Sequence, residues 1–208
     1  MRKSWVIVDF DCEYWVELPV DEDWRNTSWG SEKEWGKSAA EVLLEFKNIP
    51  GNRKLLRRLG KDLVGYRRAF EEHAPGREHY LYFRDLESDP LSMHLWYGPA
   101  EDERDVALRR NTRADSTDTM FPPQVEEIAS EALGTGLRSL NHVLLEDQTV
   151  AANLWYAFRD DKREVDLIAL ASSGDLGPLA AAMSDFDEFV QSISLFDEGD
   201  EYWNDLHT

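Results

Sequence analysis

The feature that most constrains the fold is an alternating run of side chains between Thr149 and Phe158. Apolar residues return at every second position, with mostly smaller or polar residues between them, which is the period of a strand packed against a core. These residues are Val150, Ala152, Leu154, Tyr156 and Phe158. Similar segments at Leu137–Leu145 and Glu164–Ala171 flank the run across tight polar turns. The C-terminal third therefore predicts three consecutive antiparallel strands.

The first half of the chain instead carries helical periodicity. Ser31 and Glu34 form a capping-box pattern, and apolar residues at helical spacing follow, so residues 31–48 are predicted to be an amphipathic helix. A second apolar stripe predicts a helix over residues 52–73, after a Pro-Gly break. We expect the two helices to form a hairpin that packs against a sheet.

The other segments complete an α+β fold. Residues 5–10 and 14–18 read as two short strands or one interrupted strand, and residues 79–84 and 92–97 as two more. Residues 100–119 are expected to form a long polar loop, 123–133 a short helix, and 184–193 a final helix. The expected architecture is a mainly antiparallel sheet of six to seven strands with helices packed on its faces.

Length and composition favour one globular domain. The chain has 208 residues, is 42% hydrophobic and contains eight Trp, a composition that a disordered chain lacks. No internal repeat or low-complexity linker divides it. We expect a single domain over residues 1–196, followed by an acidic tail at 197–208.

Charge narrows the classes of partner. The net charge of −19 repels phosphate backbones and anionic lipids, which argues against nucleic acid as a ligand. No apolar run is long enough to cross a membrane, so no membrane insertion is expected. Asp9 and Asp11 interrupt the first apolar stretch too early for a signal peptide, and the expected location is the cytoplasm.

Residues that could carry catalysis are sparse. Cys12 is the single cysteine and lies between two acids, which disfavours a thiolate nucleophile. His79 and His94 sit on predicted strands that could be neighbours, and hydrogen-bonded structural histidines are the main interpretation. Asp9 and Asp11 would share a face of the first strand and could bind a metal, but no second motif supports them. We expect no catalytic residue, no metal site and no cofactor.

Two features suggest binding to another protein. Seven of the 23 positive charges lie within residues 53–68, with Arg53, Arg57 and Lys61 four apart on one side of the predicted helix. These cations either pair with acids of the same chain or form a docking face. Trp24 and Trp29 lie in a polar stretch and either pack in the core or line an interface.

The order of elements resembles the PsbP-like superfamily, with its DcrB/EagR-type and LpqN-type relatives. The resemblance is carried by Leu18-Pro19 followed by Trp24 after the first strands, and by a closing helix with Asp185-Phe186 and Val190-Gln191-Ser192-Ile193. It implies an antiparallel sheet with helices on both faces in a non-enzymatic binding or chaperone module. The family shares no catalytic residues, and its PsbP and LpqN members are exported, whereas no export signal is recognised here.

Taken together, these patterns predict a non-enzymatic cytoplasmic binding protein of adaptor, chaperone or immunity type that engages a protein partner. The resemblance favours a link to a bacterial secretion system. Two alternatives stay open. One is a metal-dependent hydrolase built on Asp9 and Asp11, and the other is a structural subunit of a larger assembly, including a homo-oligomer.

Overall fold

A computed structural model describes residues 4–19 and 29–197. The chain divides into two compact units. The first, called the hairpin unit, is Asp11–Trp96, and the second, called the sheet unit, joins Met1–Phe10 to Tyr97–Thr208. The predicted tail lies outside the described residues except for Asp197, as does Trp24. The prediction of a single domain over residues 1–196 stays a prediction.

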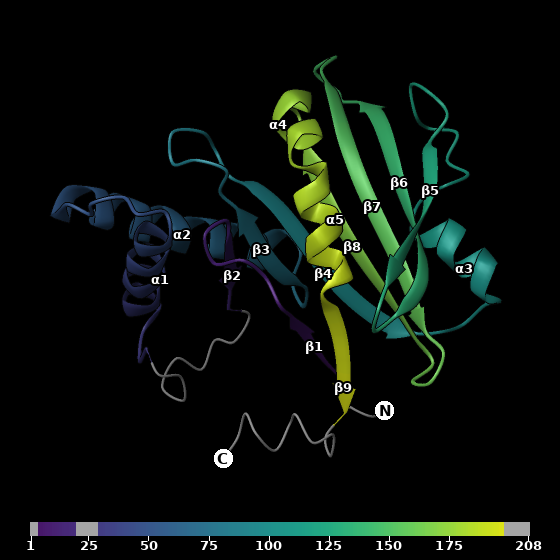
Figure 1. Cartoon of the computed structure of the whole chain (residues 1–208). Coiled ribbons are helices and arrows are strands. Elements are labelled where there is room, and N and C mark those ends of the chain that lie inside the picture. Colours follow the sequence, from purple (N-terminus) through teal and green to yellow (C-terminus); the bar gives the residue numbers. More distant parts are fainter. Residues whose placement is uncertain (1–3, 20–28, 198–208) are drawn as a thin grey trace. The chain divides into compact units, whose positions relative to one another are not determined.

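The elements of the hairpin unit follow the predicted order closely (Figure 1). They are β2 (Trp15–Leu18), α1 (Glu32–Phe46), α2 (Arg53–His73), β3 (Glu78–Tyr82) and most of β4 (Leu91–Pro99). Strand β2 pairs antiparallel with β3, and β3 with β4. Both helices and all three strands were predicted from sequence periodicity.

The sheet unit holds the remaining elements, in which β6, β7 and β8 form the predicted antiparallel series (Figure 1). The elements are β1 (Ser4–Val8), α3 (Arg104–Asn111), β5 (Gln124–Ser130), β6 (Gly134–Leu144), β7 (Val150–Asp160), β8 (Val165–Ser173), α4 (Leu176–Ala181), α5 (Met183–Gln191) and β9 (Ile193–Asp197). Strand order is β2-β3-β4-β8-β7-β6-β5, with β1-β9 as a separate antiparallel pair. The predicted α+β class with a mainly antiparallel seven-stranded sheet is confirmed.

Side-chain caps fix where α1 and α2 begin. The Ser31 hydroxyl accepts a hydrogen bond from the Glu34 amide at 3.2 Å and donates to the Glu34 carboxylate at 3.1 Å. The Asn52 side chain accepts from the amides of Lys54 and Leu55. Each cap satisfies amides that have no partner inside the first helical turn, so both helices start at the predicted positions.

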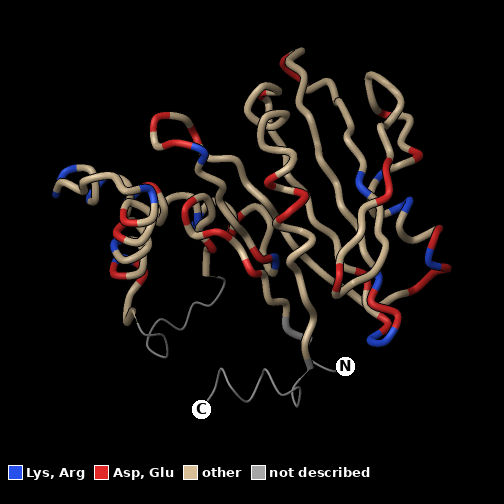
Figure 2. The backbone as a smooth tube through the Cα atoms, viewed as in Figure 1, with Lys and Arg blue, Asp and Glu red and all other residues tan. Residues whose placement is uncertain are grey.

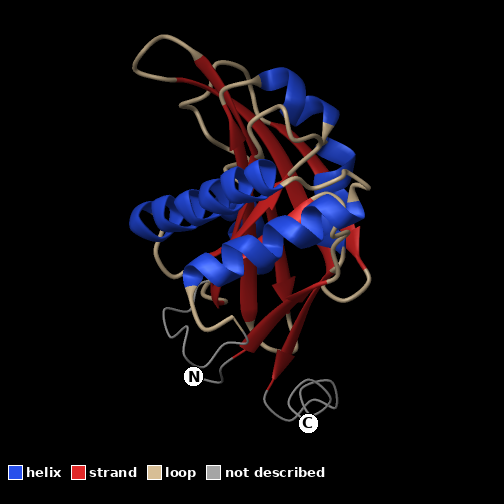
Figure 3. Cartoon of the chain, turned by 90° about the vertical axis from the view of Figure 1, so that its left-hand side faces the viewer, coloured by secondary structure: helices blue, strands red, loops and turns tan. Residues whose placement is uncertain are grey.

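Two glycines set how closely α1 and α2 pack, side by side, in the hairpin unit (Figure 3). A Cβ on Gly36 would lie 2.6 Å from the carbonyl oxygen of Gly60, and a Cβ on Gly60 would lie 3.0 Å from that of Gly36. The two backbones therefore touch where the helices cross. Below them, the helices and the β2–β3 pair share one core, which includes Leu18, Trp35, Leu43, Leu63, Leu81 and Phe83.

Helices cover both faces of the strands in the sheet unit. Tyr156 of β7 is fully buried and donates a hydrogen bond from its hydroxyl to Asp187 of α5 at 2.8 Å. The next residue back, Trp155, points to the opposite face, where Arg113 lies after the end of α3. Since neighbouring strand residues face opposite ways, α5 and the α3 region lie on opposite sides of β7.

Two sequence predictions in the sheet unit are wrong. Residues 100–119 are not a continuous loop, because α3 forms within them. This helix buries only the adjacent residues Ala107 and Leu108, so no repeating apolar stripe marks it. Residues 123–133 are not a helix, because Gln124–Ser130 forms β5. Pairing of β5 with β6 overrides the helix propensity of Glu126 and Glu127. Strand β5 is an edge strand of the sheet, where polar side chains are tolerated.

Sequence reasoning also missed α4 and β9, while α5 confirms the predicted final helix. In the described residues, no helix has the length and apolar character needed to cross a membrane.

Candidate functional site

The N-terminal half of α2 presents an exposed row of cations, here called the basic face: Arg53, Lys54, Arg57, Arg58 and Lys61. All five residues are exposed, and blue segments mark this stretch in Figure 2. In the described chain, none of the five forms an ion pair with a carboxylate. The docking interpretation of Arg53, Arg57 and Lys61 therefore stays open, and internal pairing within the described residues does not account for them.

Internal pairing does account for the other end of the same helix. The Arg67 guanidinium donates to Glu32 at 3.0 Å and to the carbonyl oxygen of Pro19 at 2.8 Å. Arg68 donates to the second oxygen of Glu32 at 2.9 Å. These contacts tie α2 to the start of α1 and lower the pKa of Glu32 against the opposing effect of its burial. Of the seven predicted basic residues, two have this structural role.

The basic face lies where cations weaken a helix. Arg53 and Lys54 stand in the first turn, which has no acid and where the helix dipole favours negative charge. Arg53, Arg57 and Lys61 repeat at intervals of four, a spacing at which like charges repel by about 0.2–0.5 kcal/mol per pair. The arrangement thus costs local stability, and no ion pair within residues 4–19 and 29–197 offsets that cost.

Of the two tryptophans of the predicted interface, the described residues include Trp29. Trp29 precedes α1 and is 37% exposed, whereas Trp35 in α1 is only 3% exposed and belongs to the core. Trp24 lies outside the described residues. Trp29 remains a candidate contact residue beside the start of the hairpin.

The alternative metal site is not built as predicted. Strand β1 ends at Val8, so Asp9 and Asp11 follow the strand instead of sharing its face. The Asp11 carboxylate accepts a hydrogen bond from the Glu13 amide at 2.8 Å and shapes a turn. Across residues 4–19 and 29–197, no group of three or more His, Cys, Asp or Glu side chains could hold a metal ion.

The two strand histidines do meet, as predicted. Their Nδ1 atoms lie 2.8 Å apart in the hairpin unit, where β3 pairs His79 with His94 of β4, and Phe70 of α2 packs against both rings. One Nδ1 donates and the other accepts, so a proton on both rings would place two N–H groups face to face. Burial lowers the pKa of His79, and burial with the neighbouring His79 and Arg77 lowers the pKa of His94 to about 4.

This pair should make the stability of the protein depend on pH. An unfolded histidine titrates near pH 6.5, so the pair's contribution is complete above that value and is lost as the pH falls toward 4. The free energy of unfolding in urea should fall between pH 7 and pH 4.5, and replacing His94 with Gln should make this fall about 2 kcal/mol smaller. An unchanged pH slope in H94Q would contradict the assignment.

A titrating carboxylate lies on the same strand pair. Glu78 of β3 accepts a hydrogen bond from the Tyr80 hydroxyl at 3.2 Å, and burial together with the neighbouring Glu17 raises the pKa of Glu78 to about 7. Its effect on stability has the opposite sign, since stability is lost as the pH rises toward 7. Comparing H94Q with the unchanged chain cancels this contribution.

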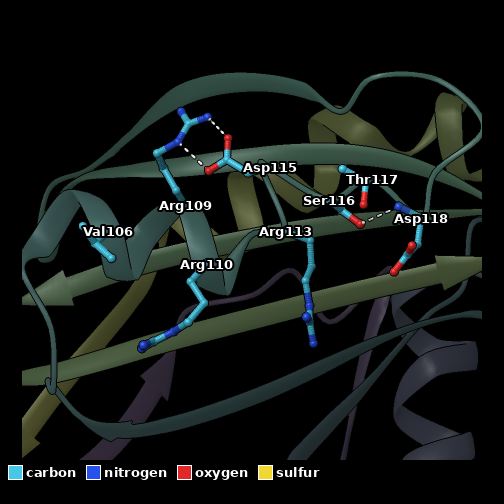
Figure 4. Close-up of a pocket in the computed structure, with 8 residues that line it drawn as sticks. All are labelled: Val106, Arg109, Arg110, Arg113, Asp115, Ser116, Thr117 and Asp118. Atoms are coloured by element: carbon cyan, nitrogen blue, oxygen red, sulfur yellow. Dashed lines mark hydrogen bonds and ion pairs between the residues drawn. The ribbon is translucent and has the colours of Figure 1, made fainter.

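A pocket of about 510 Å³ lies at the end of α3 in the sheet unit (Figure 4). Its lining residues are Val106, Arg109, Arg110, Arg113, Asp115, Ser116, Thr117 and Asp118. Arg109 makes a bidentate ion pair with Asp115, and Arg110 forms an ion pair with Asp102. Arg113 extends away from the Arg109–Asp115 pair (Figure 4). Three arginines thus line a pocket in a strongly acidic protein.

Sequence reasoning missed this pocket because it assigned the segment to a loop without periodicity. A usable signal was present, since three of the 16 arginines fall at positions 109, 110 and 113 of an acidic chain. Comparison with known proteins adds no functional assignment: no protein-family model and no curated protein matches the sequence.

Proposed function

We propose that this chain is a non-enzymatic binding protein that engages an acidic segment of a partner protein through the basic face of α2. The observation that carries the proposal is the set of five exposed cations that lack ion-pair partners in the described structure. Their placement lowers the stability of the helix, and an acidic partner would reverse that effect by supplying the missing opposite charge.

The basic face can act locally despite the net charge of −19. At physiological ionic strength charges are screened over about 8 Å, so a bound segment responds mainly to the side chains that it touches. The acidic remainder of the surface would repel an acidic partner from other approaches and restrict it to this helix. A cytoplasmic adaptor or chaperone role, as the PsbP-like resemblance suggests, fits a protein that recognises one charged segment.

The test is a charge reversal on the basic face. The variant Arg53→Glu/Arg57→Glu/Lys61→Glu should weaken binding of a labelled oligoglutamate peptide by at least about tenfold, because three rim contacts become repulsive. Fluorescence anisotropy measures the affinity, and raising the salt concentration should weaken binding by the unchanged chain. The reversal should leave the stability of the helix nearly unchanged, since it puts an acid in the first turn but keeps three like charges at the same spacing of four.

A matched control separates local from global charge. The variant Lys33→Glu/Lys37→Glu/Arg84→Glu changes the net charge equally, at exposed positions of the same unit but outside the basic face. It should bind the peptide nearly as well as the unchanged chain. Equal losses in both variants, or no binding by the unchanged chain at low salt, would refute the proposal.

A further inference from the structure

The turn that follows α3 is a standard helix ending with an unusual residue. The amide of Arg113 donates to the carbonyl oxygen of Arg110 at 3.1 Å, and the amide of Ala114 donates to that of Arg109 at 2.9 Å. These two bonds define a Schellman motif, in which the residue after the cap adopts a left-handed conformation and is usually glycine. Here Arg113 occupies that position with φ of 56°.

The arginine is therefore kept where its backbone is strained. The left-handed conformation is unfavourable for any residue that has a Cβ, whereas glycine adopts it without this cost in free energy. A strained backbone motivates a functional hypothesis when contacts within the protein do not explain why that side chain is kept there. Asn48, Gln148 and Glu164 also have positive φ, but Arg113 is the one of the four that lines the pocket.

Structural contacts do not explain the Arg113 side chain. Arg109 and Arg110 are each paired with an aspartate, and as cations at a helix C-terminus they also suit the helix dipole. The guanidinium of Arg113 has no hydrogen-bond acceptor in the described residues. The guanidinium lies over the Trp155 ring, whose centroid is 5.9 Å from Cζ, near the outer limit of a cation–π interaction.

The other lining groups indicate what Arg113 would hold. Ser116 accepts a hydrogen bond from the Asp118 amide at 3.4 Å, which leaves its hydroxyl hydrogen available, and the exposed Thr117 adds a second hydroxyl. Asp115 is neutralised by Arg109, whereas Asp118 has no ion pair in the described residues. An arginine fork and hydroxyl donors that line the same pocket are groups that bind a phosphate or carboxylate.

We propose that this pocket binds the oxyanion group, phosphate or carboxylate, of a small organic molecule, with Arg113 as the ligand-binding cation. The volume of about 510 Å³ is in the range of small-molecule sites and exceeds what a bare oxyanion fills. The site belongs to the sheet unit and is independent of the basic face in the hairpin unit.

The experiment is an NMR titration of the full chain with inorganic phosphate, phenyl phosphate and benzoate. A chloride titration serves as the reference, and the ionic strength is held constant throughout. The amide signals of residues 113–118 should shift, and phenyl phosphate or benzoate should bind more tightly than inorganic phosphate. The stronger of the two aromatic ligands identifies the preferred oxyanion. Shifts confined to other residues, or equal shifts with chloride, would overturn the proposal.

Three variants test the role of each charge. Arg113→Gln should raise the dissociation constant at least about tenfold, because a charge-assisted contact is lost, and Asp118→Asn should lower it by removing repulsion. Arg113→Gly should abolish binding while raising Tm by about 2–4 °C, since glycine relieves the left-handed strain. Loss of binding in a more stable protein cannot come from unfolding. Undiminished binding by either Arg113 variant would refute the assignment, and Arg84→Gln, at an exposed position outside both sites, should leave binding unchanged.

Discussion

Replacing Gly36 with alanine is expected to destabilise the hairpin unit by about 2–3 kcal/mol. The added methyl would lie 2.6 Å from the backbone oxygen of Gly60 and 2.8 Å from a methyl of Val64. The Val64 side chain can rotate, but the Gly60 backbone cannot yield without separating α1 from α2 and loosening the core below them. Urea unfolding followed by circular dichroism measures the loss.

The same helix pair offers a matched control. Gly65 lies in α2, and an added Cβ there meets nothing within 4 Å. Gly65→Ala should therefore stabilise the protein by up to about 1 kcal/mol, the difference in helix propensity between the two residues. A Gly36→Ala variant that gained stability as Gly65→Ala does would show that the close backbone approach is not required.

Replacing Arg159 with methionine is expected to cost about 3–5 kcal/mol. Arg159 and Asp166 are 7% and 4% exposed and face each other across β7 and β8, joined by hydrogen bonds of 2.6 and 2.8 Å. A third bond, at 2.6 Å, runs from Arg159 to the backbone carbonyl of Asp102, just before α3. Removing the cation leaves a buried carboxylate without its partner, which is far more costly than losing the net value of the pair.

A double variant separates these two costs. Arg159→Met/Asp166→Leu removes both charges and should recover much of the lost stability, although the Asp102 contact remains absent. Chemical denaturation of the single and double variants gives the coupling free energy. If the double variant were instead less stable than Arg159→Met, the loss of stability in Arg159→Met would not come from an unpaired Asp166 carboxylate.

The elements found from the sequence are those whose periodicity is enforced by a core. Leu154, Tyr156 and Phe158 alternate because one face of β7 is fully buried, and the apolar stripe of α2 repeats because α2 rests on a shared core. Helix α3 buries too little to generate a pattern, and β5 is decided by its pairing with β6. Local sequence carries no record of a partner strand, so these two assignments failed.

The candidate sites divide in the same way. Helical spacing was enough to place Arg53, Arg57 and Lys61 on one helix face, because that geometry is local. The meeting of His79 and His94 followed from predicting two neighbouring strands. The role proposed for Arg113 is argued from its backbone conformation and from the absence of a nearby acceptor in the described structure, neither of which is encoded in spacing along the chain.

The antiparallel pairing of β1 with β9 has a consequence for how the protein is made. Residues 4–8 pair with residues 193–197 in register, so nearly the whole described chain separates the two partners. A ribosome releases the chain from the N-terminus onward, and β1 therefore emerges long before its partner exists. Contacts between residues so far apart in the sequence also form slowly, because closing the long loop between them costs conformational entropy. The β1–β9 ribbon should form last, after synthesis has passed β9, with the remaining strands of the sheet unit already assembled.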